Sequence, residues 1–242
     1  MTVLVAGASG ATGRHVVEQL LVRGEEVRVI VRSVVLLPEF FIGHPNISII
    51  LTNVLEMSDL EMANAVKGCD TVISCLGHTP SFKGMFGFPR RLVTDATRRL
   101  CDAIRFNQPS AKVKFILMNS SGVSNPDLGE KISFKQKVVM LVLRKLLPAH
   151  ADNENAAAFL RETIGQHDAM IEWSAVRPDG LVNEDAVSHY KIFSSPTKSA
   201  IFEAGKVSRI NVGHFMAELA SDIDLWNRWK GQMPVIYGAV SY

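Results

Sequence analysis

Cysteines and long apolar runs are scarce in this sequence of 242 residues. The three cysteines, Cys69, Cys75 and Cys101, form no Cys-x-x-Cys pair, which argues against a disulfide framework and favours a reducing compartment. No group of histidines, cysteines and carboxylates has the spacing of metal ligands, so we expect no metal site. The longest apolar stretch, residues 138–147, contains two basic residues and is too short to cross a bilayer.

A strong excess of charge of one sign is also absent, because the formal net charge is +2 and the charges are spread along the chain. This weak charge argues against a nucleic-acid partner. The N-terminus lacks the basic region and cleavage pattern of a signal peptide. No Walker-type Gly-Lys-Ser/Thr loop and no Gly-x-Ser-x-Gly elbow occurs, which weakens kinase-like and hydrolase interpretations. We expect a cytoplasmic protein without a membrane span.

The sequence does contain a regular alternation of short apolar runs with helical patterns, which extends to about residue 178. Strands that alternate with helices are typical of a parallel sheet, and uninterrupted apolar strands indicate that helices cover both of its faces. The chain is therefore expected to be an α/β protein with a doubly wound parallel sheet. The apolar runs predict six buried strands, at residues 3–6, 27–31, 47–51, 71–76, 113–118 and 171–176.

The composition and length indicate one globular domain. Hydrophobic residues make up 47% of the chain and charged residues 21%, and we find no internal repeat and no interdomain linker. The length fits a single α/β domain over residues 1–242. We expect its core at about residues 1–182. The remaining tail, about residues 183–242, is predicted to supply a small substrate-side cap with a closing helix around residues 212–220.

The strongest chemical signal is a glycine-rich turn between the first predicted strand and the first predicted helix. Gly7 permits a tight turn out of the strand, Gly10 lets a diphosphate approach the backbone, and Gly13 allows close packing of helix on sheet. The start of the following helix offers unpaired amide groups and a positive dipole end to an anion. The alternative is a glycine-rich turn without a ligand. The flanking strand and helix favour a dinucleotide site.

The end of the second predicted strand favours NADP(H) over NAD(H). An NAD site usually places an acidic residue there, to bind the ribose 2′-hydroxyl. Here Arg32 and Ser33 follow the strand, and Arg14 follows the last glycine of the turn. A guanidinium suits a 2′-phosphate because its fork of donors binds pairs of oxygens. The alternative is that both arginines are only solvated charges at the ends of their elements.

Four segments together resemble the atypical short-chain dehydrogenase/reductase superfamily, in its NAD(P)H-binding, NmrA-like branch. The resemblance covers most of residues 1–182 and implies a Rossmann fold. It says little about the substrate. The matching segments are the turn Gly7-x-x-Gly10-x-x-Gly13 with Arg32, residues 68–77 (GCDTVISCLG), residues 115–123 (FILMNSSGV) and residues 173–178 (WSAVRP).

The resemblance also implies where the cofactor would be held. The glycine turn would hold the phosphates, the arginines would face the 2′-phosphate, and the ends of the third, fourth and sixth strands would contact adenine and nicotinamide. Asn53 stands where the family commonly has an aspartate, and its amide oxygen can still accept a hydrogen bond. The implied cofactor residues are Gly7, Ser9, Gly10, Ala11, Thr12, Gly13, Arg14, Arg32, Ser33, Asn53, Val54, Cys75, Leu76, Gly77, Arg177 and Pro178.

The catalytic pattern of the superfamily is incomplete in this chain. Carbonyl-reducing members commonly use a Tyr-x-x-x-Lys pair, in which tyrosine donates a proton, with a serine from the fifth strand. Ser120 and Ser121 match the serine, but the expected region, residues 150–156, contains neither tyrosine nor lysine. His150, His78 or a proton from the substrate would have to replace the tyrosine. We predict Ser120, Ser121 and His150 as catalytic residues.

Three functions remain open at this stage. The first is an NADP(H)-dependent oxidoreductase that transfers hydride to a small carbonyl, quinone or flavin-like acceptor. The second is a non-catalytic NADP(H)-binding redox sensor that acts through a protein partner, and the third is an assembly factor with a structural nucleotide. The basic, apolar stretch at residues 131–147 predicts a helix buried in the core or at a homodimer interface, or else one lying on a membrane or partner.

Overall fold

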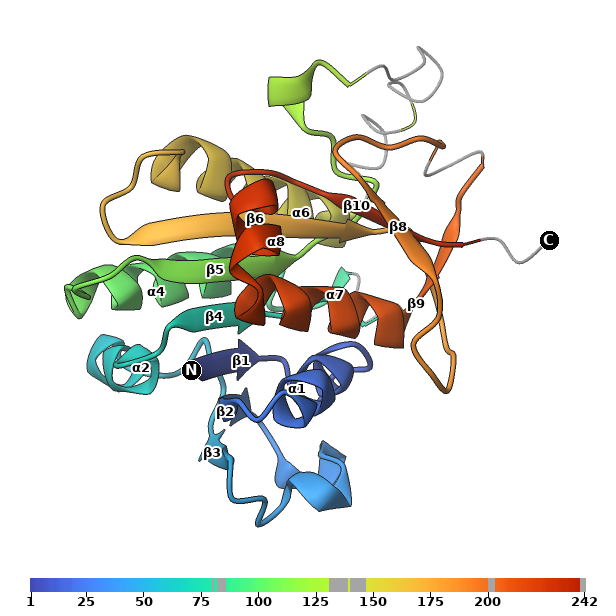
Figure 1. The fold of residues 1–242 in the computed structure, drawn as a ribbon. Coiled ribbons are helices and arrows are strands. Elements are labelled where there is room, and N and C mark those ends of the chain that lie inside the picture. The colour runs from blue at the N-terminus through green and yellow to red at the C-terminus, as the bar shows by residue number, and fades with distance from the viewer. Residues whose placement is uncertain (80, 82–85, 131–138, 140–146, 200–202, 240–242) are drawn as a thin grey trace.

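The computed structural model describes residues 1–79, 81, 86–130, 139, 147–199 and 203–239. The strands within these ranges form an eight-stranded sheet in the order β3-β2-β1-β4-β5-β6-β10-β8 (Figure 1). Every pair of neighbours is parallel except β10 and β8. The sheet strands are β1 (Thr2–Ala6), β2 (Glu26–Val31), β3 (Ile47–Leu51), β4 (Thr71–Ser74), β5 (Val113–Met118), β6 (Ile171–Pro178), β8 (Tyr190–Phe193) and β10 (Val235–Gly238).

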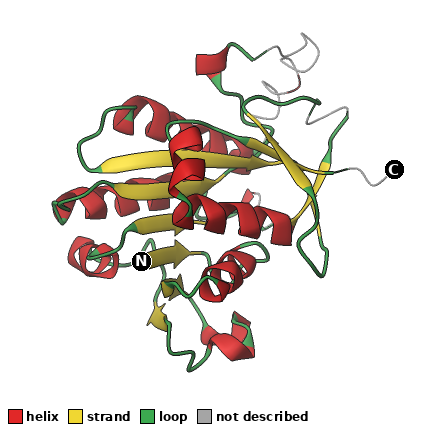
Figure 2. Cartoon of the chain, viewed as in Figure 1, coloured by secondary structure: helices red, strands yellow, loops and turns green. Residues whose placement is uncertain are grey.

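Helices cover both faces of the sheet, as Figure 2 shows. One face carries α1 (Gly13–Val22), α7 (Arg209–Ser221) and α8 (Ile223–Trp229), and the other carries α2 (Asp59–Val66), α4 (Leu92–Phe106) and α6 (Pro148–Ala158). The two hydrophobic clusters of the core lie on these two faces. Short helical turns are η1 (Val34–Leu36), η2 (Glu39–Phe41), η3 (Pro126–Leu128) and η4 (Phe159–Ile164), and a separate parallel pair joins β7 (Gly180–Val182) to β9 (Lys206–Ser208).

This arrangement confirms the predicted α/β fold with a doubly wound parallel sheet and all six predicted strands. The central strands are buried as their uninterrupted apolar sequences require; β1, for example, is buried from Val3 to Ala6, whereas the edge strand β3 is only partly buried. In α1, Val16, Val17 and Leu20 form the buried stripe at helical spacing. The chain order reverses between β1 and β4, so that the carboxyl ends of these strands flank a crevice suited to a ligand.

The tail contributes more to the core than the sequence indicates. The predicted closing helix is α7, but it packs on the sheet beside α1 instead of forming part of a cap. A Cβ added to Gly213 would lie 2.7 Å from the Cβ of His15, so the two helices are in close contact. Trp226 and Trp229 are buried in the same cluster, and β10 inserts between β6 and β8. Much of the tail therefore belongs to the core, and a substrate-side cap stays a prediction.

Two predictions from the sequence concern a membrane span and the basic stretch at residues 131–147. No helix in the described ranges is both long and apolar enough to cross a membrane. The basic stretch at residues 131–147 lies outside the described residues except for Val139 and Leu147, so its predicted helix remains a prediction.

Candidate functional site

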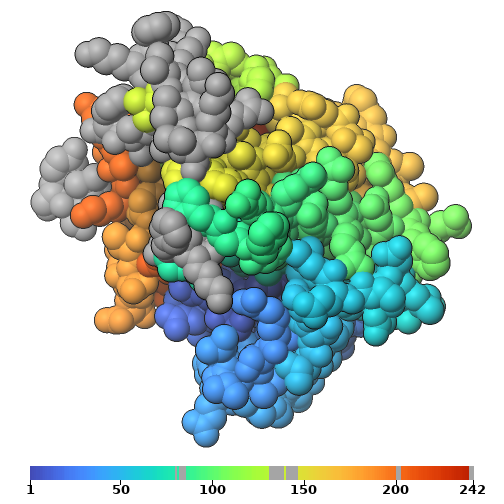
Figure 3. All heavy atoms as spheres, turned by 180° about the vertical axis from the view of Figure 1, so that it is seen from behind, coloured from blue at the N-terminus to red at the C-terminus, as the bar shows by residue number. Residues whose placement is uncertain are grey.

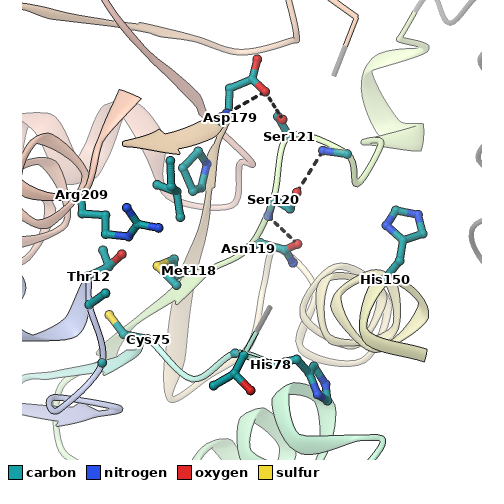
Figure 4. Close-up of a pocket in the computed structure, with 18 of the residues that line it drawn as sticks. Thr12, Cys75, His78, Met118, Asn119, Ser120, Ser121, His150, Asp179 and Arg209 are labelled. Atoms are coloured by element: carbon teal, nitrogen blue, oxygen red, sulfur yellow. Dashed lines mark hydrogen bonds between the residues drawn. The ribbon is translucent and has the colours of Figure 1, made fainter. Parts of the chain in front are cut away.

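A cavity of about 710 Å³ opens where the strand order reverses, at the carboxyl ends of β1, β4, β5 and β6 (Figure 4). Segments from both halves of the chain form its walls: the glycine turn, the end of β4, the loop after β5, and the segment from the end of β6 to α7. The lining residues are Gly10, Ala11, Thr12, Cys75, Gly77, His78, Thr79, Met118, Asn119, Ser120, Ser121, Gly122, His150, Pro178, Asp179, Gly180, Leu181, Ala204 and Arg209.

The glycine turn has a geometry that larger residues would disrupt. Gly7 has a φ of 85°, and a Cβ there would lie 2.8 Å from the carbonyl carbon of Cys75 at the end of β4. A Cβ on Gly13 would lie 2.9 Å from the carbonyl carbon of Gly7, and closer still to its oxygen. Gly10 is exposed toward the cavity, and its amide donates to the carbonyl oxygen of Gly7 at 3.0 Å. The turn is therefore held tightly against β4 while its outer side stays open.

The amides at the start of α1 provide the chemistry of an anion site. Within the described ranges, the backbone N–H groups of Ala11, Thr12 and Gly13 have no hydrogen-bond partner in the protein. The Thr12 side chain does not cap the helix. Ala11 and Thr12 line the cavity at the positive end of the helix dipole, so the donor set fits the diphosphate of a dinucleotide.

The predicted 2′-phosphate residues lie directly after β2 and at the start of α1. Arg14 and Arg32 are exposed, and neither forms an ion pair with any residue that the structure describes. The Ser33 hydroxyl accepts a hydrogen bond from the amide of Val35 at 3.3 Å and so caps η1. Neither arginine lines the cavity itself, so their contact with a cofactor remains a prediction.

The predicted adenine-side residues form an ordered turn after β3. The Asn53 side-chain oxygen accepts from the amide of Leu55 at 3.2 Å, and its amide group donates to Glu56 at 2.8 Å. Val54 is buried, and its carbonyl oxygen accepts from Arg99 at 3.0 Å. This turn does not line the cavity, and its role also stays a prediction.

At the end of β4, the backbone approaches the glycine turn. Cys75 and Gly77 line the cavity, whereas Leu76 packs against the core. Burial raises the pKa of the Cys75 thiol to about 12, so the residue stays a neutral thiol near neutral pH. It can contribute shape to the cavity but no nucleophile.

The loop after β5 places polar groups at the opposite end of the cavity. The Ser121 hydroxyl donates to Asp179 Oδ1 at 3.0 Å (Figure 4). The Gly205 amide donates to Asp179 Oδ2 at 2.8 Å. The Ser120 hydroxyl accepts from the Gly122 amide at 3.2 Å. The sequence reasoning missed Asp179, although its position directly after the buried strand β6 is a signal for the ligand edge of the sheet.

Two histidines line the cavity from different elements. His150 lies on α6, with Nε2 3.4 Å from Glu154 Oε1. His78 follows β4, and its Nε2 lies 2.8 Å from Asp152 Oδ2. Asp152 is buried and also accepts hydrogen bonds from the first amides of α4, so His78 is held by a structural carboxylate. Both histidines therefore share the cavity with the serines, as the catalytic prediction requires.

The sequence predicts Arg177 as a cofactor residue, but the structure places its side chain away from the cavity. Its side chain is fully buried and does not line the cavity, whereas the adjacent Pro178 does. Its guanidinium pairs with Glu130 at 2.7 Å and donates to the backbone oxygens of Val123, Met233 and Ser194. Since its donors are already used inside the protein, the Arg177 side chain anchors β6 and is not available to a ligand in the cavity.

No described tyrosine takes the place of the missing proton donor. Tyr237 is buried beside Phe193. The Tyr190 hydroxyl donates to Glu218 at 2.8 Å, far along α7, and burial and this carboxylate raise the pKa of Tyr190. Neither residue lines the cavity. The third tyrosine, Tyr242, lies outside the described residues.

A doubly wound parallel sheet with this glycine turn at its switch point defines a nucleotide-binding Rossmann-fold protein. Residues 7–223 match the model of a family described as NAD(P)H-binding. The chain therefore belongs to the NAD(P)H-binding family, which confirms the resemblance found in the sequence. The match spans the glycine turn, the cavity and α7.

Solved structures share this fold at low sequence identity. A short-chain dehydrogenase/reductase of Veillonella parvula in complex with NADP has a TM-score of 0.71 at 15% identity. The match covers 99% of this chain and 95% of the Veillonella chain. The oxidoreductase ylbE of Lactococcus lactis has a TM-score of 0.69 at 16% identity, with 99% and 91% covered. A Streptococcus pneumoniae protein whose name suggests an NADH-flavin reductase has a TM-score of 0.68 at 16% identity, with 99% and 100% covered.

A relative with higher identity is an uncharacterized chloroplastic protein of Arabidopsis thaliana, which is 30% identical over 188 residues, or 75% of this chain. The chain spans 60% of the length of that relative. Because the relative is chloroplastic, the cytoplasmic location expected from the sequence stays a prediction.

Proposed function

We propose that the protein is an NADP(H)-dependent oxidoreductase that transfers hydride between the nicotinamide and a small carbonyl, quinone or flavin-like acceptor. The observation that carries this proposal is one continuous cavity that joins the glycine turn to polar side chains at the ends of β5 and β6. A dinucleotide held by the glycine turn can extend along this cavity, which brings its reactive end toward Ser120, Ser121 and His150.

The preference for NADP(H) is supported by charge at the ends of β2 and α1. Arg14 and Arg32 have no anionic partner within the described ranges, and no acidic residue follows β2 to bind a free ribose hydroxyl. A 2′-phosphate would supply the missing anion. Ser33 can add a hydroxyl contact only by giving up or sharing its cap of η1.

When bound, the cofactor supplies or accepts a hydride. The residues of this chain bind and orient the cofactor and restrict the access of water to it. The amides of the glycine turn fix the diphosphate, while Met118, Pro178 and Leu181 give the central cavity an apolar wall that restricts water. A proton for the reduced acceptor would come from His150, which lines the cavity together with Ser120. Ser120 would bind the acceptor oxygen, whereas the Ser121 hydroxyl is already donated to Asp179.

The acceptor class follows from the missing Tyr-x-x-x-Lys pair. Reduction of a ketone needs a strong proton donor beside the developing alkoxide, and none of the described cavity residues is a tyrosine or a lysine. A quinone or flavin accepts hydride with less help from an acid. We therefore expect faster turnover with quinones or flavins than with simple ketones.

The test is NADPH oxidation by the purified protein, followed by absorbance, with a panel of quinones, free flavins and ketones. Binding of NADPH and NADH is measured by calorimetry on the same sample. Tight NADPH binding with turnover of a quinone or flavin supports the proposal. Absence of binding to either dinucleotide refutes it. Gly13→Ala serves as the binding-deficient control, because its added methyl displaces the glycine turn.

A second candidate is a non-catalytic NADP(H)-binding sensor or assembly factor that acts through a protein partner. The absence of tyrosine and lysine among the described cavity residues favours it. NADPH binding without turnover of any acceptor would support this candidate over the first. Loss of partner binding on removal of the nucleotide would then separate a sensor from a factor in which the nucleotide is structural.

A further inference from the structure

The cavity has a source of positive charge that the glycine turn does not supply. Arg209 is the first residue of α7 and lines the cavity together with Gly10, Ala11 and Thr12. Figure 4 shows its guanidinium beside Thr12, directed into the cavity. The residue is half-buried, so its charge is only partly screened by water.

The packing of the two helices explains why Arg209 reaches the turn. Gly213 lies against His15, so α7 runs directly beside α1, and the start of each helix borders the same cavity. Figures 1 and 3 both show the orange segment after β6 beside the blue N-terminal segment. A residue late in the sequence is therefore placed beside Ala11 and Thr12 in the lining of the cavity.

Arg209 has no carboxylate partner among the residues that the structure describes. Its guanidinium donates to the side-chain oxygen of Asn183 at 2.8 Å, which orients it without neutralising it. The carboxylate of Asp179 lies in the same cavity, but it accepts hydrogen bonds from Ser121, Gly180 and Gly205. An arginine that is half-buried and not neutralised in a ligand cavity is suited to bind an anion.

We propose that Arg209 binds the diphosphate of the dinucleotide beside the glycine turn, so that the tail of the chain completes the cofactor site. This inference rests on the proposed function, because it takes the dinucleotide as the ligand of the cavity. The amides of the turn hold the diphosphate, and Arg209 adds a full positive charge next to them. The diphosphate is common to NADPH and NADH, so Arg209 strengthens the binding of both.

The test compares Arg209→Gln with the natural protein in calorimetric titrations with NADPH, NADH and 2′-AMP. We expect the Kd for both dinucleotides to rise by the same factor, about tenfold or more, because a charge-assisted hydrogen bond is lost. The Kd for 2′-AMP, which lacks the diphosphate, is expected to stay the same. An unchanged Kd for both dinucleotides overturns the proposal, as does an equal loss for 2′-AMP.

Two further variants separate a loss of charge at this position from a general effect. Lys206→Gln removes an equal charge from an exposed residue of β9 that does not line this cavity, and it is expected to leave the Kd unchanged. Arg209→Lys keeps the charge and is expected to recover part of the affinity. Thermal melting confirms that each variant is folded. If the natural protein itself binds neither dinucleotide, the proposed function fails; if it binds and Arg209→Gln binds equally, only this inference fails.

Discussion

The close contact between Gly13 and Gly7 allows a quantitative prediction for Gly13→Ala. The added Cβ would lie 2.9 Å from the Gly7 carbonyl carbon and 3.2 Å from the Cys75 Cβ. Carbon atoms pack best at roughly 3.5 to 4.0 Å, and the Gly7 oxygen lies closer still, so the start of α1 must move away from the turn by at least roughly 0.6 Å. Overpacking of this kind costs about 1–3 kcal/mol. For a chain of this size, the melting temperature should fall by roughly 2 to 12 °C.

The same displacement affects the ligand. A shift of about this size lengthens hydrogen bonds from the amides of Ala11, Thr12 and Gly13 beyond their useful range, so NADPH affinity should fall by at least about tenfold. The assay is thermal melting without ligand, followed by calorimetric titration with NADPH. Gly10→Ala is the intermediate case, because its Cβ would meet only the Gly7 oxygen, at 3.1 Å.

Gly77→Ala is the matched control for the ligand-free melt, since a Cβ there meets nothing within 4 Å. Its melting temperature should stay within about 2 °C of that of the natural protein. If Gly13→Ala melts like the control and binds NADPH with unchanged affinity, the packing argument for the glycine turn is wrong.

Three further predictions concern charged side chains. Arg32→Asp should weaken NADPH by about tenfold or more and leave NADH within about twofold, because only the 2′-phosphate contact is lost; equal losses for both would place Arg32 elsewhere. Glu130→Gln should destabilise the fold by about 3 kcal/mol in urea unfolding, because it leaves the buried guanidinium of Arg177 without its anion, at 2.7 Å in the natural protein; a change below about 1 kcal/mol would contradict this. Burial raises the pKa of Asp168, but the hydrogen bonds from Arg105 and two backbone amides outweigh it and lower the pKa overall. Its stabilisation should therefore be present above about pH 4 and be lost as the pH falls further, so Asp168→Asn should flatten the acid limb of the stability profile.

Much of the fold could be predicted from local sequence patterns. The six strands and the glycine turn were found correctly because each is specified by residues that are close together in the chain. A buried parallel strand needs an uninterrupted apolar run, and the turn needs glycine where Gly7 has a φ of 85° and where Gly13 meets the Gly7 carbonyl. These requirements are visible without knowledge of any distant contact.

The tail was harder to predict because its role depends on partners far away in the sequence. The helix around residues 212–220 was predicted, but not that Gly213 packs against His15 or that β10 joins the sheet beside β6. These elements of the tail belong to the core, and a substrate-side cap stays a prediction. Helical spacing shows that a helix has an apolar side, but not which surface covers it.

In the candidate site, too, some features follow from the local sequence and others only from the folded chain. By itself, the sequence determined the α/β fold, the glycine turn and the lack of a Tyr-x-x-x-Lys pair in residues 150–156, because backbone geometry and residue identity decide these locally. Only the tertiary structure decided that Arg177 is a buried anchor and that Asp179 and Arg209 line the cavity. The direction in which a charged side chain points depends on which distant groups neutralise it, and the chain brings those groups together only when it folds.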